Sequence, residues 1–209
     1  MNAVVPITVM CVDDHPLFMQ GIEKVVAHEK DLQMVASAAT GREALIAFRT
    51  HKPAVTLMDL RLSDMSGIDA VVSIRAEFPE AKIVMLTTFE GDWEIQRALS
   101  AGCLGYLLKS TPFQELVDVI RKVSQGRKHI PADIAQTLAE NIGKEMLSER
   151  EMDVLRRLAD GDRNRDIASQ LAISEQTVKA HVVRIMAKLG ARDRTQAVAI
   201  AIRRGLIHL

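Results

Sequence analysis

The stretch Ile7-Thr-Val-Met-Cys-Val-Asp-Asp14 decides the fold, because an apolar run ends there abruptly in two adjacent carboxylates. Similar short apolar runs recur through Met1–Gln125 and alternate with longer amphipathic stretches. Strands that are buried on both faces of a parallel sheet are continuous apolar runs of this kind. The runs that we predict as strands are Ile7–Val12, Gln33–Ala38, Ala54–Met58, Ile83–Leu86 and Gly105–Leu108.

Helix signals lie between these runs. Thr40-Gly-Arg-Glu43 is a capping box that predicts a helix over Gly41–His51. Thr111-Pro-Phe-Gln114 is a second one, with Pro112 at the first helical position of Pro112–Gln125. Alternating strands and helices with right-handed crossovers predict an α/β domain, namely a flavodoxin-like, doubly wound, five-stranded parallel sheet.

The pattern changes after Gln125. Residues 126–146 carry weak signals, with a short helix expected over Ala132–Asn141, and we interpret them as a linker. Beyond the linker every signal is helical, so residues 147–209 are expected to form a small all-α domain with a helix-turn-helix. Its helices are expected from the capping box Ser148-Glu-Arg-Glu151 to Asp160, then over Arg163–Leu171, Glu175–Leu189 and Thr195–Arg204.

The composition is that of a folded protein with aliphatic cores. Of 209 residues, 48% are hydrophobic, 26% charged and only 3% aromatic. No apolar run approaches the ~20 residues that cross a bilayer, and the N-terminus lacks the basic region of a signal peptide, so we expect no membrane association. Two cysteines cannot build a disulfide framework, which favours the cytoplasm as the location.

The neutral overall charge hides an asymmetry. Residues 1–145 carry a net charge of −4, and residues 146–209 carry +4. A basic C-terminal part is consistent with contact to a polyanion, although a difference this small is often only surface solvation.

Polar side chains follow the predicted strands at one edge of the sheet. Because ligands bind at the carboxyl ends of the strands in open α/β sheets, these side chains are candidates for a site. Adjacent carboxylates need neutralisation, and Mg²⁺ takes carboxylate and phosphate oxygens. A carboxylate nucleophile, a metal and a lysine together indicate phosphoryl transfer. The side chains are Asp13, Asp14, Asp59, Thr87 and Lys109.

On these residues, Met1–Gln125 resembles the receiver domain of two-component response regulators. The resemblance implies that Asp59 is the phosphoacceptor for a partner sensor histidine kinase. It implies that Asp14, Asp59 and the Arg61 backbone carbonyl hold Mg²⁺, and that Asp13 acts through water. Thr87 would bond the phosphoryl group and Lys109 would pair with it.

The resemblance also assigns a conformational switch. Tyr106, three residues before the lysine, is at the family's aromatic switch position, where it would act with Thr87. A core tyrosine is the alternative. The chain departs from the family at Leu62-Ser63, where relatives often have Met-Pro, and Thr88 makes the assignment of the hydroxyl slightly ambiguous.

The helix predicted over Glu175–Leu189 has two distinct faces. An apolar stripe at spacings of four, three and four must face the core. It consists of Val178, Val182, Ile185 and Leu189. A small, partly cationic outward face fits the major groove of DNA, and the flanking polar groups can reach phosphates. The outward residues are Gln176, Lys179, Ala180 and Val183, with Thr177, Arg184 and Lys188 on the opposite flank.

Residues 147–209 resemble the LuxR-type helix-turn-helix domain over its full length. The motifs that carry the resemblance include Leu147-Ser-Glu-Arg-Glu151, Thr177-Val-Lys-Ala-His181 and Lys188-Leu-Gly190. The resemblance implies that Lys179 reads bases and backbone in the major groove of promoter DNA and that Thr177 contacts phosphate. It also implies a homodimer through the last helix, and therefore a two-fold-related operator with recognition helices ~34–36 Å apart.

Two other functions remain open from the residues alone. Phosphatases with an aspartate nucleophile also use a doubly wound sheet, Mg²⁺ and a lysine, but they place an Asp-x-Asp pattern after the first strand and need a substrate-binding cap. A constitutive DNA-binding regulator with an inactive acidic site is the other alternative. We expect a phosphorylation-dependent transcriptional regulator rather than an enzyme, with chemistry limited to its own phosphorylation and dephosphorylation.

Overall fold

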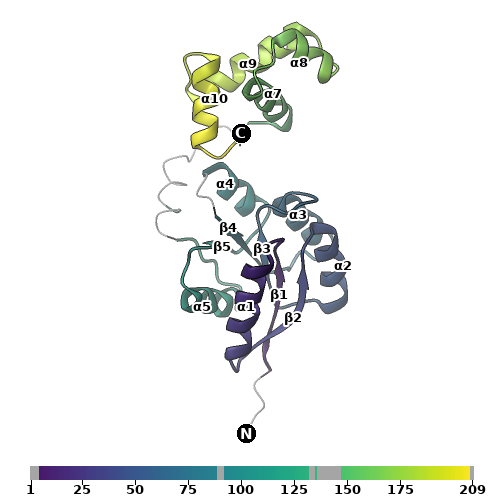
Figure 1. Cartoon of the computed structure of the whole chain (residues 1–209), viewed down its shortest axis with the longest axis vertical. Helices are drawn as coiled ribbons and strands as arrows, with labels where there is room; N and C mark the ends of the chain where they lie inside the picture. Colours follow the sequence, from purple (N-terminus) through teal and green to yellow (C-terminus); the bar gives the residue numbers. More distant parts are fainter. Residues whose placement is uncertain (1–4, 89–91, 132–134, 136–146, 208–209) are drawn as a thin grey trace. The chain divides into compact units, whose positions relative to one another are not determined.

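Five parallel strands form the sheet of the N-terminal unit, in the order β2-β1-β3-β4-β5 (Figure 1). The computed structural model describes residues 5–88, 92–131, 135 and 147–207, which form two compact units. The chain passes from β1 outward to β2, returns to β3 on the other side of β1, and continues to β5. The strands are β1 (Ile7–Val12), β2 (Leu32–Ala38), β3 (Val55–Asp59), β4 (Ile83–Thr87) and β5 (Gly105–Leu108).

Helices cover both faces of this sheet. α1 packs against α5, and α2 packs against α3, which gives the two outer layers (Figure 1). The central strands β3 and β4 are buried along their whole length. The predicted doubly wound α/β fold is therefore confirmed. The helices are α1 (Pro16–His28), α2 (Gly41–His51), α3 (Gly67–Glu77), α4 (Asp92–Ser100) and α5 (Phe113–Ser124).

The capping signals in the sequence predict the start of α2 correctly but not the start of α5. Thr40 caps α2 as predicted, since its side chain accepts a hydrogen bond from the Glu43 backbone N–H. The capping box predicted at Thr111 is wrong: Pro112 is the N-cap of α5 and makes no side-chain capping bond. The strand β2 is only partly buried, because it lies at the edge of the sheet.

The chain leaving α5 returns to the sheet. His129 forms a parallel bridge with Gly105, the first residue of β5. The His129 N–H donates to Leu104 O over 2.8 Å, and the Tyr106 N–H donates to His129 O over 3.1 Å. The beginning of the segment expected as a linker is therefore bonded to the edge of the sheet.

The C-terminal unit is entirely helical in its described residues. Ser148 begins α7 with the predicted capping box, in which both reciprocal hydrogen bonds are present. α7 and α8 both pack on α9, and α10 packs on α9 and α7. The short helix expected over Ala132–Asn141 lies outside the described residues, apart from Ala135. The helices are α7 (Glu149–Ala159), α8 (Asn164–Gln170), α9 (Glu175–Leu189) and α10 (Arg194–Arg203).

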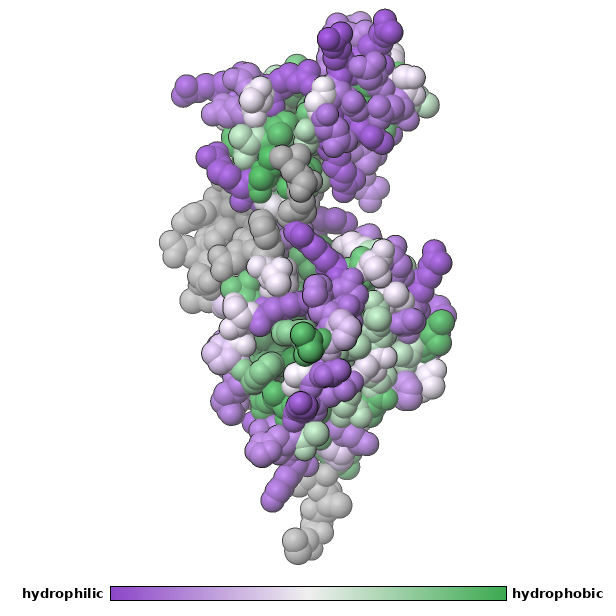
Figure 2. All heavy atoms as spheres, in the orientation of Figure 1, coloured by the Kyte–Doolittle hydropathy of each residue, from purple (hydrophilic) through white to green (hydrophobic). Residues whose placement is uncertain are grey.

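The surface is mixed in character. Figure 2 shows hydrophobic surface over α1 and α5, where Leu17 is 84% and Phe113 46% exposed.

Both cysteines, Cys11 and Cys103, are buried and unbridged. Across the described ranges, every helix is too short or too polar to cross a bilayer.

Candidate functional sites

The predicted acidic site is assembled at the carboxyl end of the sheet. Asp13 follows β1 directly, Asp59 is the last residue of β3, and Lys109 follows β5. The Lys109 Nζ atom lies 2.7 Å from Asp13 Oδ2 and 2.9 Å from Asp59 Oδ2. One ammonium group therefore bridges two carboxylates that come from different strands.

Burial and charge perturb this cluster. The side chains of Asp13 and Asp59 are almost fully buried, and that of Lys109 is 10% exposed. Burial raises the pKa of Asp59, and the Asp13 charge raises it further, while the Lys109 ammonium opposes both. Burial lowers the pKa of Lys109, but its contacts with Asp13 and Asp59 outweigh that effect and raise it. Lys109 therefore stays protonated at neutral pH.

The donor set suits a hard cation. Asp13, Asp14, His15 and Asp59 each offer a ligand atom, and these atoms lie within 4.8 Å of one another. Asp13 Oδ2 and Asp14 Oδ1 are shielded from solvent without a well-directed hydrogen bond from any described residue. Their close partners are the cation of Lys109 and the ring of His15. Clustered carboxylate oxygens of this kind are the ligands that Mg²⁺ takes in proteins.

The loop after β3 fits tightly against the carbonyl of Asp59. The Gly67 N–H donates to Leu60 O over 2.9 Å, which brings the start of α3 back to the end of β3. A Cβ atom on Gly67 would lie 1.9 Å from the Asp59 carbonyl oxygen, which is much shorter than any contact between non-bonded atoms. Glycine is therefore required here by close approach of the backbone.

The two predicted switch residues are both buried. Thr87 ends β4, and its carbonyl accepts a hydrogen bond from the Lys109 N–H over 2.6 Å. Tyr106 is fully buried in β5. Thr88, the alternative hydroxyl, is exposed. The roles of both residues stay predictions.

The second candidate site is the outer face of α9. Val178 and Ile185 are fully buried, with Val182 and Leu189 packed against the same core, so the predicted apolar stripe faces inward. The expected outward positions are exposed, and Val183 exposes 60% of its surface. The exposed candidates are Gln176, Thr177, Lys179, Ala180, Val183 and Arg184.

The start of α9 is held by a local network. Ser174 is the N-cap, and its hydroxyl accepts from the Thr177 N–H over 3.0 Å and lies 2.7 Å from the Thr177 hydroxyl. Lys179 lies 3.4 Å from Glu175 in an exposed ion pair. An exposed pair of this type is weak, so Lys179 can exchange Glu175 for a phosphate or base at little cost.

Comparisons with known proteins identify a family for each of the two units. The family described as "Response regulator receiver domain" matches residues 9–121, more than half of the chain. The family described as "Bacterial regulatory proteins, luxR family" matches residues 145–201. The chain is a response regulator. It combines a receiver domain with a LuxR-type helix-turn-helix, as the sequence motifs indicated.

Relatives match this response regulator along nearly its whole length. Response regulator protein VraR of Staphylococcus aureus is 39% identical over 207 residues, which cover 97% of this chain and 99% of the relative. The crystal structure of ChrA, from a heme-sensing two-component system, is 33% identical with a TM-score of 0.56 and covers 97% and 99% of the two chains. An RcsB–DNA complex, 24% identical over 95% of this chain and 98% of the other, has a TM-score of 0.68 and shows the fold alone.

Lys188 does not fit its predicted part in the DNA-binding face. Its side chain is 19% exposed, and its Nζ atom lies 2.9 Å from Oε2 of the buried Glu151. The same carboxylate oxygen accepts from the Ser148 N–H over 2.8 Å. Lys188 therefore ties the end of α9 to the start of α7, and an outward phosphate contact would require breaking this pair. Helical spacing alone could not reveal the partner on α7.

The Glu151–Lys188 pair yields a stability prediction for the response regulator. Burial raises the pKa of Glu151, but its bonds to Ser148 and Lys188 prevail and lower it. Replacing Lys188 with methionine removes the cation from a buried carboxylate that keeps its bonds to Ser148, at an expected cost of about 1–3 kcal/mol near neutral pH. Because the folded-state pKa is lowered, this stabilisation exists above the unfolded-state pKa and disappears as the pH falls through the folded-state value.

Hydrogen exchange of the α7 and α9 amides measures this effect in the full-length chain. Lys188→Met should exchange faster at pH 7, and its difference from wild type should shrink in acid. Lys179→Met is the matched control, because its ion pair with Glu175 is exposed and its exchange should stay at the wild-type level. A Lys188→Met chain with wild-type protection at pH 7 would contradict the structural role.

The sequence interpretation missed His15. Its Nδ1 atom lies 2.8 Å from Asp14 Oδ1 and 3.1 Å from Asp13 Oδ1, and its N–H donates to Asp13 Oδ1 over 2.9 Å. Its position directly after the acidic pair was the available signal. The backbone bond fixes one oxygen of Asp13, which leaves the other oxygen to Lys109.

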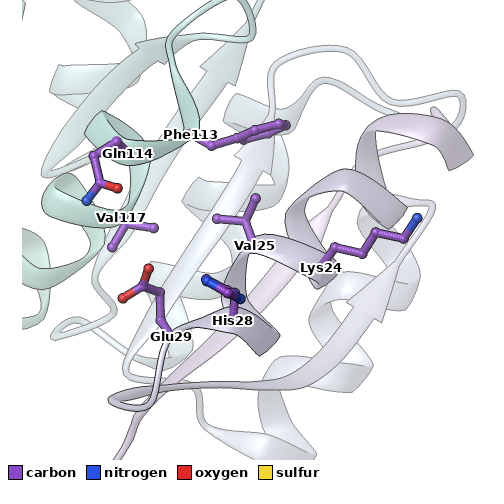
Figure 3. A pocket seen from close by; sticks show the side chains of 7 residues that line it. All are labelled: Lys24, Val25, His28, Glu29, Phe113, Gln114 and Val117. Atoms are coloured by element: carbon purple, nitrogen blue, oxygen red, sulfur yellow. The ribbon is translucent and has the colours of Figure 1, made fainter.

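A groove outside the acidic pocket lies between α1 and α5 (Figure 3). It has a volume of about 330 Å³, and its walls combine the apolar Val25, Val117 and Phe113 with charged and polar groups. Figure 3 shows the side chains of α1 and α5 facing each other across it. The remaining lining residues are Lys24, His28, Glu29 and Gln114.

Proposed function

We propose that this response regulator accepts a phosphoryl group on Asp59 from a sensor histidine kinase and then binds promoter DNA as a dimer. The observation that carries the proposal is the bridge from Lys109 to Asp13 and Asp59 at the end of the sheet. It supports the proposal because the Asp59 carboxylate is in contact with a protonated lysine and both side chains are almost fully buried. We also propose a cytosolic location, which fits two buried cysteines without a bridge.

The chemistry follows from the groups that surround Asp59. A carboxylate oxygen of Asp59 attacks phosphorus and becomes an aspartyl phosphate. The Lys109 ammonium is within contact distance of Asp59 Oδ2 and stabilises charge on the transferred oxygens. The Thr87 hydroxyl bonds the phosphoryl group from the neighbouring strand. The phosphoryl group carries close to two negative charges, and these draw Thr87 and Lys109 toward it.

Mg²⁺ fits the remaining donors. We assign it to Asp14, Asp59 and the Arg61 backbone carbonyl, with Asp13 acting through water. A bound magnesium ion neutralises the charge on the transferred oxygens and orients them. The shielded carboxylate oxygens of Asp13 and Asp14 support this assignment, since neither accepts a well-directed hydrogen bond from a described residue and their nearest partners are the Lys109 ammonium and the His15 ring.

For DNA, we propose that α9 enters the major groove. Lys179 is exposed on the outward face and reads bases and backbone there. Thr177 and Arg184 contact phosphates, and Val183 offers an apolar contact such as a thymine methyl. Gln176 and Ala180 complete the face. The exposed part of α10 forms the contact between the two copies.

A mobility-shift experiment tests the coupling of the two sites. DNA duplexes are first selected from a random pool by the full-length chain in the presence of acetyl phosphate and Mg²⁺. We expect tighter binding with the phosphodonor than without it, and a two-fold-related selected sequence. Lys179→Ala should weaken binding about tenfold or more, because it removes a groove contact. Arg156→Ala, which removes a cation of α7, should bind as wild type.

The outcomes separate the alternatives. Equal affinity with and without phosphodonor would favour a constitutive DNA-binding regulator. Steady release of phosphate over many turnovers, without a change in DNA binding, would favour a phosphatase. Unchanged affinity of Lys179→Ala would argue against the placement of α9 in the groove.

A further inference from the structure

The aromatic ring of Phe18 lies beside the acidic pocket. It lies in the first turns of α1, and its N–H donates to His15 O over 3.1 Å just after the acidic pair. Its ring faces Lys109, whose Nζ atom lies 5.0 Å from the ring centroid. An ammonium within about 6 Å of a ring centroid is attracted to the negative face of the ring.

The surroundings of this ammonium leave little room for water. The Lys109 side chain is 10% exposed, with two carboxylate oxygens within 2.9 Å of its Nζ atom. Phe18 is partly buried and packs against the core of the N-terminal unit, so its ring is held in place. The ring thus replaces part of the hydration shell that burial removes from Lys109.

We infer that Phe18 is a positioning residue for phosphoryl transfer, acting through the ammonium of Lys109. This inference rests on the proposed function of Asp59. A lysine has a flexible four-carbon stem, so its charge is placed only if its surroundings restrict it. The carboxylates hold the ammonium by ion pairs, and the ring holds it without a directional bond. The ammonium can therefore shift toward new charge at Asp59 and stay in contact with the ring.

Acetyl phosphate is the probe that defines the step. A carboxylate oxygen of Asp59 forms a bond to phosphorus while the bond from phosphorus to the acetate oxygen breaks, and the electron pair leaves with acetate. Lys109 stays protonated throughout. Its position matters most when charge develops on the transferred oxygens, so a loss of positioning lowers the maximal rate more than the affinity for the phosphodonor.

The full-length chain with saturating Mg²⁺ provides the test. Phe18→Leu keeps an apolar side chain but removes the ring, and its maximal rate of phosphorylation should fall about threefold to tenfold. The half-saturating concentration of acetyl phosphate should stay the same. Phe18→Tyr keeps the ring and should restore the rate to within about twofold of wild type. Met19→Leu is the control for packing, since Met19 is on the same helix against the same core.

A second measurement is independent of phosphorylation. With ¹³C-labelled lysine, the ε protons of Lys109 should show an upfield ring-current shift in the metal-free wild type and in Phe18→Tyr. The shift should be lost in Phe18→Leu, and Lys109→Met assigns the signal. This readout reports where the ammonium lies, which a general loss of stability would not reproduce.

The outcomes are decisive in each case. If the wild type takes up no phosphate, the proposed function fails and the inference fails with it. If the wild type is labelled and Phe18→Leu matches it in rate and in Lys109 shift, the inference alone is overturned. A Phe18→Tyr variant as slow as Phe18→Leu would also overturn it, because the ring would then not be the cause.

Discussion

Replacing Asp59 with asparagine should reduce phosphate incorporation from acetyl phosphate to background. An amide is not a nucleophile for phosphorus, and the other carboxylates of the pocket come from the end of a different strand. The measurement is the change in mass of the full-length chain after incubation with acetyl phosphate and Mg²⁺. An aspartyl phosphate is also cleaved by hydroxylamine, which distinguishes it from a phosphorylated hydroxyl.

The loss should not come from unfolding. Burial raises the pKa of Asp59, so its ionised form destabilises the folded state at neutral pH. Asparagine removes that charge, and Lys109 keeps Asp13 as its partner, so the melting temperature should stay the same or rise. Because the folded-state pKa is raised, the gain over wild type should appear as the pH rises through that pKa and should vanish in acid.

Asp69→Asn is the matched control for Asp59→Asn. Asp69 is an exposed carboxylate of α3 that pairs with Arg97, outside the pocket. It should be labelled like the wild type. Labelling of Asp59→Asn at the wild-type level would show that another side chain accepts the phosphoryl group, and the assignment of the site would be withdrawn.

Gly67→Ala should damage both folding and phosphorylation. The added methyl group would lie 1.9 Å from the Asp59 carbonyl oxygen and 3.2 Å from Leu60 Cα, so backbone must move. We expect a loss of about 3 kcal/mol or more in the free energy of unfolding of the N-terminal unit. Where the fold survives, a shift of Asp59 by about 1 Å should slow phosphorylation about a hundredfold.

Urea unfolding and acetyl phosphate kinetics measure the two effects of Gly67→Ala. Gly21→Ala is the control, because the added methyl group in the middle of α1 would meet Phe113 Cζ at 3.4 Å, an ordinary contact. Removing a glycine from a helix interior should stabilise the chain by about 0.5–1 kcal/mol. Wild-type stability and rate in Gly67→Ala would show that the loop can move away from Asp59 at no cost.

The sequence was a good guide to the acidic pocket because the pocket depends on topology. In a parallel sheet the carboxyl ends of all strands meet at one edge. Asp13, Asp59 and Lys109 therefore converge whatever residues lie between them in the sequence. Even so, β3 and β4 each end one residue later than predicted, since Asp59 and Thr87 are themselves the last paired residues.

Contacts between distant elements could not be predicted in this way. The distance from Phe18 to Lys109 and the pairing of Lys188 with Glu151 depend on how helices are docked, which helical periodicity does not encode. The capping box predicted at Thr111 fails for a local reason. Pro112 has the extended backbone of a cap, so α5 begins at Phe113, one residue later than predicted.

The bridge between His129 and Gly105 determines where this chain can be divided safely. A fragment that stops after Gln125 would leave the backbone groups of Leu104 and Tyr106 open at the border of the sheet, and such groups recruit strands from other molecules. A fragment that continues through Pro131 keeps them paired. Recombinant fragments with the longer end should therefore resist self-association in concentrated solution, and the shorter ones should not.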